Sequence, residues 1–176
     1  MTFIETELKG LWLIEPNMKS DERGSFGRTF CVREFGDRGL TTVFPQWSLS
    51  TTIKRGTIRG MHFQMDPKPE TKLVRCTRGK IFDVAVDLRK SSQTYLKWYG
   101  VELSSENHRS LYIPSGFAHG FQTLENQAEV LYAISEFFDP ALATGVRWDD
   151  PKVKVKWPLP ISVINSRDSQ WPIVDN

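Results

Sequence analysis

The chain has 176 residues, of which 39% are hydrophobic and 25% are charged, and this composition excludes a disordered protein. Its 23 basic and 21 acidic residues leave a net charge of +2, which is too balanced for a dedicated nucleic-acid-binding protein. We expect residues 1–176 to form a single domain that needs no disulfide or metal, because a chain of this length buries roughly 68–70% of its unfolded surface.

The N-terminal segment contains neither a basic region nor an apolar run of signal-peptide length. No later stretch approaches the roughly 20 apolar residues that span a bilayer. We therefore expect a cytoplasmic protein without a membrane partner. Cys31 and Cys76 are too few for a four-thiolate zinc site, and two reduced thiols are favoured over one disulfide.

Short alternating segments, typical of β-strands, recur along the chain. In chain order, the patterns predict a strand at 11–16, a short helix at 32–38, and strands at 57–64, 72–76, 81–88, 99–103, 110–113, 117–123 and 129–137. Many short strands separated by turn signals indicate a β-sandwich or barrel. We expect an all-β fold of the jelly-roll or cupin type, a β-sandwich barrel with a few short helices.

The segments 72–76 and 81–88 flank Arg78-Gly79-Lys80, which is typical of a turn, so we predict that they pair as a hairpin. The alternation within 81–88 gives an apolar face of Phe82, Val84, Val86 and Leu88 and a second face of Asp83, Ala85 and Asp87. The second face meets either solvent or the inside of a barrel. In the latter case Asp83 would hold Lys72 or His119 in place.

Two short segments contain candidate functional histidines. Arg59 and His62 lie on one predicted strand, and His119 lies between small residues, where the backbone can approach a ligand closely. We expect no metal, because Gln64 stands where the His-x-His pair of a metal-binding cupin needs its second histidine. Strict alternation would point Arg59 and His62 to opposite faces. If both line one site, the strand must be irregular, and Gly60 is the predicted position of a bulge or kink.

Six segments over the whole chain form a specific pattern when taken in order. They are Asp21-Glu22-Arg23-Gly24, Arg59-Gly60-Met61-His62-Phe63-Gln64, Lys72-Leu73-Val74-Arg75, Phe82-Asp83-Val84-Ala85-Val86-Asp87-Leu88-Arg89, Gly116-Phe117-Ala118-His119-Gly120-Phe121 and Trp148-Asp149-Asp150-Pro151. In this order they resemble the dTDP-4-dehydrorhamnose 3,5-epimerase family. The resemblance implies a jelly-roll homodimer without metal or organic cofactor. It also implies a nucleotide-diphosphate sugar substrate, namely a 4-keto-6-deoxy sugar.

The resemblance also implies roles for individual residues. His62 matches the base that removes a proton beside the ketone, and Asp168 matches its carboxylate partner. Lys72 matches the cation at the enolate oxygen, and Tyr132 matches the acid that reprotonates the opposite face. A larger set is expected to bind the substrate: Arg23, Arg28, Gln46, Arg59, His119, Phe138 and Arg167.

Departures from the family pattern are concentrated at the nucleotide end of the expected site. Arg28 replaces a glutamate, Ala143 replaces a second glutamate, and Phe137-Phe138 stand where a stacking tyrosine is common. Arg167 stands where lysine is usual. These changes suggest the hypothesis that the protein uses a related nucleotide sugar or holds dTDP through altered contacts.

We favour an epimerase that inverts C3 and C5 of a nucleotide-linked, dTDP-type 4-keto-6-deoxyhexose. One alternative is an epimerase that inverts C3 only or uses another nucleotide, such as GDP or CDP. A second is a non-catalytic cupin that binds sugar nucleotides, and it is disfavoured because His62, Lys72, Tyr132 and Asp168 are all present. A cupin ketoisomerase is disfavoured because the tyrosine and lysine match epimerase positions.

Overall fold

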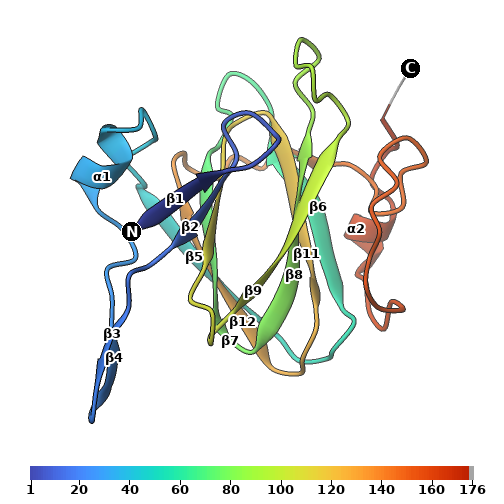
Figure 1. Ribbon diagram of the computed structural model, residues 1–176. Helices are drawn as coiled ribbons and strands as arrows, with labels where there is room; N and C mark the ends of the chain where they lie inside the picture. The colour runs from blue at the N-terminus through green and yellow to red at the C-terminus, as the bar shows by residue number, and fades with distance from the viewer. Residues whose placement is uncertain (175–176) are drawn as a thin grey trace.

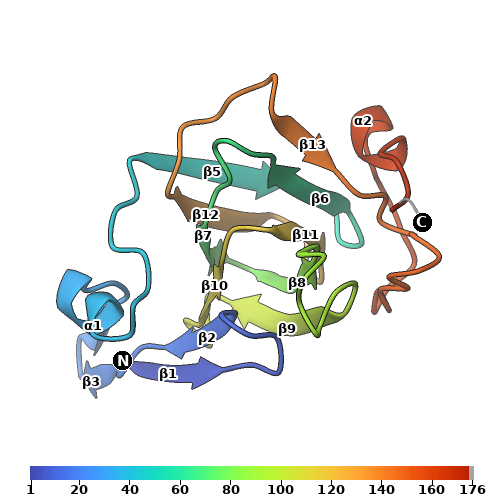
Figure 2. The same cartoon turned by 90° about the horizontal axis from the view of Figure 1, so that it is seen from above.

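The computed structural model describes residues 1–174 and shows two antiparallel sheets packed face to face (Figure 1). The six-stranded sheet consists, in spatial order, of β1 (Thr2–Glu5), β2 (Trp12–Glu15), β10 (Ser110–Ile113), β7 (Lys72–Arg78), β12 (Ala128–Ile134) and β5 (Gln46–Thr52). The five-stranded sheet consists of β13 (Ala143–Gly145), β6 (Ile58–Gln64), β11 (Phe117–Thr123), β8 (Lys80–Asp87) and β9 (Trp98–Ser104). Figure 2 shows the two layers from above. This architecture confirms the predicted all-β jelly-roll class.

The remaining elements are short. They are the hairpin of β3 (Lys19–Asp21) and β4 (Gly24–Phe26) and the helices α1 (Val32–Gly36) and α2 (Ser166–Ser169). Helix α1 confirms the helix predicted at 32–38. Within residues 1–174, no helix has the length and apolar character needed to cross a membrane.

The main core fills the space between the two sheets, because each sheet contributes its inward-facing apolar residues. From the six-stranded sheet come Leu13, Val74, Cys76, Leu111, Ile113 and Val130, and from the five-stranded sheet come Ile81, Ala85, Leu103, Phe117 and Phe121. All of these side chains are buried. The thiol of Cys76 is therefore part of the core, and both it and Cys31 are free.

Strand β8 is buried on both of its faces. The residues packed against each face show whether the face with Asp83 and Ala85 meets solvent or the inside of the barrel, a question that the sequence left open. Ala85 belongs to the core between the sheets, and Asp83 is fully buried on the same side. Val84 and Val86 face outward and are covered by the C-terminal segment through Val146 and Val153. The polar face of this strand thus lines the inside of the barrel.

The predicted pairing of 72–76 with 81–88 as a hairpin is wrong. Strand β7 pairs with β10 and β12 in one sheet, whereas β8 pairs with β11 and β9 in the other. Gly79 between them has a φ of +69° and marks the corner where the chain crosses from sheet to sheet. Both strands face the same core, so their hydrogen-bonding edges are occupied by strands distant in sequence.

Strand β5 was not predicted, and its side chains explain why. Its inward residues are polar, Gln46, Ser48 and Ser50, whereas Trp47 and Leu49 point outward and are exposed. Such a strand has the reverse of the usual pattern, because its inner face lines a cavity instead of the core. The strand predicted at 129–137 also ends earlier, at Ile134.

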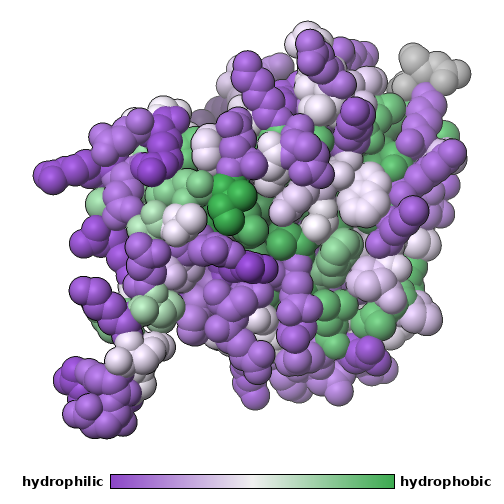
Figure 3. All heavy atoms as spheres, in the orientation of Figure 1, coloured by the Kyte–Doolittle hydropathy of each residue, from purple (hydrophilic) through white to green (hydrophobic). Residues whose placement is uncertain are grey.

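The hairpin of β3 and β4 projects from the barrel on the side away from α2 (Figures 1 and 2). All of its residues are exposed. Figure 3 shows that its tip is mainly hydrophilic. Side chains on this hairpin therefore lie outside the interior of their own barrel.

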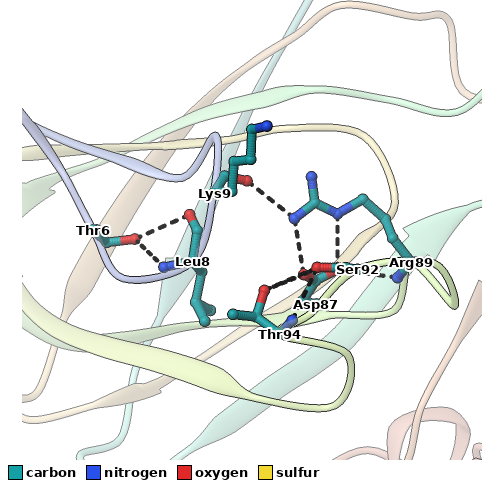
Figure 4. A network of polar contacts seen from close by, with 7 residues as sticks. All are labelled: Thr6, Leu8, Lys9, Asp87, Arg89, Ser92 and Thr94. Atoms are coloured by element: carbon teal, nitrogen blue, oxygen red, sulfur yellow. Dashed lines mark hydrogen bonds and ion pairs between the residues drawn. The ribbon is translucent and has the colours of Figure 1, made fainter.

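A buried carboxylate at the end of β8 fastens the loop that follows it to the N-terminal turn (Figure 4). Asp87 accepts hydrogen bonds from Nε of Arg89 at 2.8 Å, Oγ of Ser92 at 2.6 Å and Oγ1 of Thr94 at 2.7 Å. The guanidinium of Arg89 also donates to the carbonyl of Lys9 at 3.0 Å. Burial alone would raise the pKa of Asp87, but the hydrogen bonds from Arg89, Ser92 and Thr94 outweigh burial and lower the pKa to about 2.

Candidate active site

A cavity of about 490 Å³ opens between the two sheets, at the end where the edge strand β5 lies next to β6. It is lined by Gln46, Ser48, Ser50, Arg59, His62, Phe63, Gln64, Glu70, Lys72, His119, Phe121, Tyr132, Ile134, Phe138, Ala143, Thr144, Asn165, Arg167 and Asp168. This set contains all but two of the site residues predicted from the sequence. The exceptions are Arg23 and Arg28.

Arg23 and Arg28 do not reach this cavity within their own chain, contrary to the simplest reading of the sequence. Arg23 lies on the projecting hairpin, where it is exposed and paired with Asp21. Arg28 is also exposed and pairs with Glu34 at 2.9 Å. The physical reason for Arg23 is that residues 19–26 form a separate ribbon that leaves the barrel (Figure 1), and Arg28 lies in the segment between this ribbon and α1.

A histidine–aspartate pair forms one wall of the cavity. Nε2 of His62 lies 2.7 Å from Oδ1 of Asp168, and the imidazole is 42% exposed whereas the carboxylate is 2% exposed. The other carboxylate oxygen accepts the backbone N–H of Gly60 at 3.0 Å. Burial alone would raise the pKa of Asp168, but the hydrogen bond and attraction from His62 outweigh burial and lower the pKa. The carboxylate is therefore held ionised beside the imidazole.

Helix α2 brings Asp168 to this position, although it lies far from His62 in sequence. Asn165 caps the helix, and its side-chain oxygen accepts the backbone N–H of Asp168 at 2.6 Å. The helix packs against β6, so the carboxylate meets both Gly60 and His62. The spacing of Asn165 to Asp168 is a capping signal that sequence reasoning could have used.

The predicted irregularity at Gly60 is present. Against β11, His62 is opposite His119 and Arg59 is opposite Phe121, so three steps on β6 match two steps on β11. Gly60 has a φ of +135°, and a Cβ there would collide with the backbone of Gly120. This bulge turns both Arg59 and His62 toward the cavity.

A second histidine–aspartate pair lies deeper in the same cavity. Nε2 of His119 is 2.7 Å from Oδ1 of Asp83, and these side chains are only 4% and 0% exposed. Oδ2 of Asp83 is buried and has no hydrogen-bond partner among the described residues. Of the two partners that the sequence allowed for Asp83, the structure therefore selects His119, not Lys72.

Tyr132 lines the cavity from the opposite sheet. Its ring meets that of His119 edge to face, with ring centroids 6.0 Å apart. Its hydroxyl lies 3.5 Å from Oγ of Ser50 on β5. Burial raises the pKa of Tyr132, and the contact with Ser50 opposes this only in part. The phenol is therefore held in its protonated form.

Lys72 begins β7 and extends its ammonium group into the cavity. Nζ lies 2.8 Å from Oε1 of Glu70 and donates to the carbonyl oxygen of His62 at 3.3 Å. Glu70 was missed by sequence reasoning. Its position two residues before Lys72 is the signal that could have found it, because alternate residues of an extended chain share a face.

The outer end of the cavity is formed by aromatic side chains and arginines. Phe138 is exposed at the rim, and its backbone N–H donates to Oε1 of Gln46 at 3.0 Å. Arg167 lies over the ring of Trp171, with 4.9 Å between its Cζ and the ring centroid. Gln46 thus orients the aromatic rim, and Arg167 stays near the opening.

Metal ligands are not grouped in this site. Within residues 1–174, no three His, Cys, Asp or Glu side chains are close enough together to bind one ion. Gln64 instead ties together the loops at the rim, donating to the carbonyls of Lys68 and Phe137 and accepting the N–H of Asp139. The residues present are suited to proton transfer next to a group that becomes negatively charged.

The chain is similar to known proteins over nearly its whole length. The family model described as dTDP-4-dehydrorhamnose 3,5-epimerase matches residues 5–176. The chain is 47% identical to a dTDP-4-dehydrorhamnose 3,5-epimerase of Methanothermobacter thermautotrophicus, covering 99% of this chain and 95% of that protein.

Two solved structures are similar over nearly the whole chain. One is a dTDP-4-dehydrorhamnose 3,5-epimerase of Bacillus anthracis with TDP and PPi bound, with a TM-score of 0.95 and 39% identity over 98% of this chain and 99% of that one. The other is a dTDP-6-deoxy-D-glucose-3,5-epimerase of Legionella pneumophila in complex with dTDP-4-keto-L-rhamnose. It has a TM-score of 0.92 and 35% identity over 98% of this chain and 92% of that one.

Proposed function

Because the chain belongs to the dTDP-4-dehydrorhamnose 3,5-epimerase family, we propose that its cavity binds a dTDP-linked 4-keto-6-deoxyhexose and inverts C3 and C5. One observation supports this most directly. His62, with its Asp168 partner, and Tyr132 line one cavity from opposite sheets. Inversion needs a base on one face of the reacting carbon and an acid on the other, and this arrangement supplies both.

The proposed reaction begins at a carbon next to the C4 ketone. His62 removes the proton, and the electron pair of the C–H bond moves through the carbonyl to leave a negative charge on the ketone oxygen. Since Nε2 is bound to Asp168, Nδ1 is the ring nitrogen left to accept the proton. Asp168 orients the ring and stabilises the imidazolium that forms.

The enolate oxygen is proposed to lie beside the ammonium group of Lys72. A positioned cation in a site shielded from water lowers the barrier by several kcal/mol in comparable enzymes. Tyr132 then donates its phenolic proton to the opposite face of the carbon, and the ketone re-forms. Exchange with solvent returns His62 and Tyr132 to their starting protonation states.

Arg59 and Arg167 are proposed to bind the diphosphate, since guanidinium groups pair with phosphate oxygens through two hydrogen bonds. Both line the cavity, and the exposed ring of Phe138 offers a stacking surface for the base. Given the changes at Arg28 and Ala143, we propose that dTDP is held through altered contacts.

We also propose that the protein is a homodimer and that Arg23 and Arg28 serve the cavity of the partner. The projecting hairpin does not reach its own cavity, and apolar side chains on the hairpin and on the edge strand β5 are exposed, including Phe26, Trp47 and Leu49. Mixing Arg23→Ala with His62→Ala protomers tests this. A mixed dimer contains one cavity with both residues intact, so activity should reappear, whereas no recovery would show that Arg23 acts within its own chain or not at all.

The function itself is tested by solvent deuterium uptake into dTDP-4-keto-6-deoxyglucose, followed by NMR. We expect uptake and inversion at both C3 and C5. Uptake at C3 alone would reduce the proposal to a 3-epimerase, and no uptake would refute it. Binding of dTDP, GDP, CDP and UDP to the same protein tests the nucleotide, and tighter binding of any nucleotide other than dTDP would overturn that part.

A Tyr132→Phe variant separates the two proton transfers. Proton removal by His62 should continue, so deuterium uptake should fall less than net inversion. Equal losses of uptake and inversion would argue against tyrosine as the acid.

A further inference from the structure

Glu70 is a charged residue of the cavity for which the proposed reaction has no role. It lies just before β7, and its side chain and that of Lys72 are only 12% and 9% exposed. Its Oε1 is 2.8 Å from Nζ of Lys72. Of the carboxylates that line the cavity, Asp168 is paired with a histidine, and Glu70 is paired with a lysine.

The ammonium group of Lys72 is held from two directions. One direction is the carboxylate of Glu70, and the other is the backbone carbonyl of His62, at 3.3 Å. A lysine ammonium has three N–H donors, and the carbonyl of His62 accepts one of them, while Glu70 attracts the charge from its own side. A lysine on its own is a flexible point charge, whereas here the ammonium group is held in one place.

The bond to His62 also links the ammonium to the base. The residue whose carbonyl holds Nζ is the same residue whose ring is proposed to remove the proton. The separation of the ammonium group from the imidazole ring therefore depends mainly on the conformation of His62 itself. Preorganised donors of this kind assist a reaction because they need no rearrangement when charge develops.

We propose that Glu70 is a positioning residue of the epimerase, which holds the Lys72 ammonium in place so that the ammonium can donate to the C4 oxygen. This inference rests on the proposed function. The negative charge of Glu70 itself opposes the enolate, so its benefit comes from orientation and must exceed that repulsion. Glu70 therefore influences the reaction only through Lys72.

The test compares Glu70→Ala and Glu70→Gln with the unchanged protein in the deuterium-uptake assay. Alanine removes the acceptor, and we expect kcat to fall about 10- to 100-fold with KM changed less than about 3-fold, since misplacing a catalytic group has effects of this size. Glutamine keeps an acceptor oxygen at the same place and should recover activity to within about 5-fold of the unchanged protein. Binding of dTDP and the melting temperature should stay the same in both variants.

Glu102→Ala is a matched control, because Glu102 pairs with Lys80 at 3.3 Å on strands outside the cavity. It should change neither kcat nor KM. In a Lys72→Met background, Glu70→Ala should cause no further loss if Glu70 acts through Lys72.

Three results would overturn the inference. They are unchanged kcat in Glu70→Ala, no recovery in Glu70→Gln, or a further loss in the Lys72→Met background. These differ from failure of the proposed function, in which the unchanged protein itself would show no deuterium uptake.

Discussion

The two histidine–aspartate pairs of this protein have the same bond but different surroundings. His62 and His119 are direct partners across β6 and β11, and each Nε2 lies 2.7 Å from its carboxylate. The ring of His62 is 42% exposed to the cavity, whereas that of His119 is 4% exposed. Asp168 has both oxygens bonded, and Asp83 has one oxygen with no partner in the described part of the chain.

This difference in exposure and bonding favours a role in proton transfer for the His62 pair and a role in positioning for the His119 pair. A base must meet its substrate and remain oriented while it changes charge, which requires an open ring and a fully bonded carboxylate. A buried ring held by a partly bonded carboxylate cannot exchange protons with solvent as readily. We therefore propose proton removal for His62 and a fixed polar contact for His119.

The largest expected effect comes from removing the base. His62→Ala should lower the rate of deuterium uptake at C3 and C5 about 1,000-fold or more, within the range of general-base catalysis. We expect the fold to remain intact, because the ring of His62 is only partly buried. NMR of the substrate in D₂O measures the uptake.

His119→Ala is the matched variant and should mainly raise KM. A loss of kcat in His119→Ala as large as in His62→Ala would remove the distinction between the pairs.

The next largest effect is expected from Asp168→Asn. The amide keeps the size of the carboxylate but cannot stabilise the imidazolium, so we expect kcat to fall about 100-fold with little change in KM. Steady-state kinetics of the epimerisation check this. If kcat were unchanged, Asp168 would be only a structural anchor for Gly60 and α2.

A smaller effect is expected from Asp83→Asn. In the asparagine variant, the side-chain oxygen can still bond to His119, and the amide nitrogen replaces Oδ2, the oxygen that has no partner. We therefore expect kcat/KM to fall only about 10-fold. The same kinetic assay measures it, with the melting temperature as the check on folding. A loss equal to that of Asp168→Asn would mean that the two carboxylates have equivalent roles.

The sequence allowed much of this comparison to be predicted. Family motifs indicated His62, Asp168, Lys72 and Tyr132, and the odd spacing of Arg59 and His62 predicted the bulge at Gly60. These features are local or are shared with the family, so they can be read from the residues themselves.

Features that depend on distant contacts could not be predicted. The alternation in β8 did not show which face was internal, because both faces are buried. The hairpin expected around Gly79 failed because strand pairing is decided by partners elsewhere in the chain. Arg23 could be matched to a role, but only the structure shows that it lies outside its own cavity.

The smallest expected effect on activity comes from a third buried carboxylate, Asp87, which completes the comparison because all of its hydrogen bonds serve the fold (Figure 4). Asp87→Asn should leave kcat and KM unchanged but lower the free energy of unfolding at pH 7 by about 2 kcal/mol, since its pKa falls from 3.8 to about 2 on folding. Because the folded pKa is the lower one, this stabilisation is fully present above about pH 4. It is lost as the pH falls through about 2.

Urea unfolding between pH 7 and pH 2 measures this difference, and the free energies of unfolding of the two proteins should converge as the pH falls. Asp149→Asn, an exposed carboxylate with Arg147 two residues away, is the control and should have no effect at any pH. Activity lost in Asp87→Asn without loss of stability would show that full hydrogen bonding does not mark a carboxylate as structural.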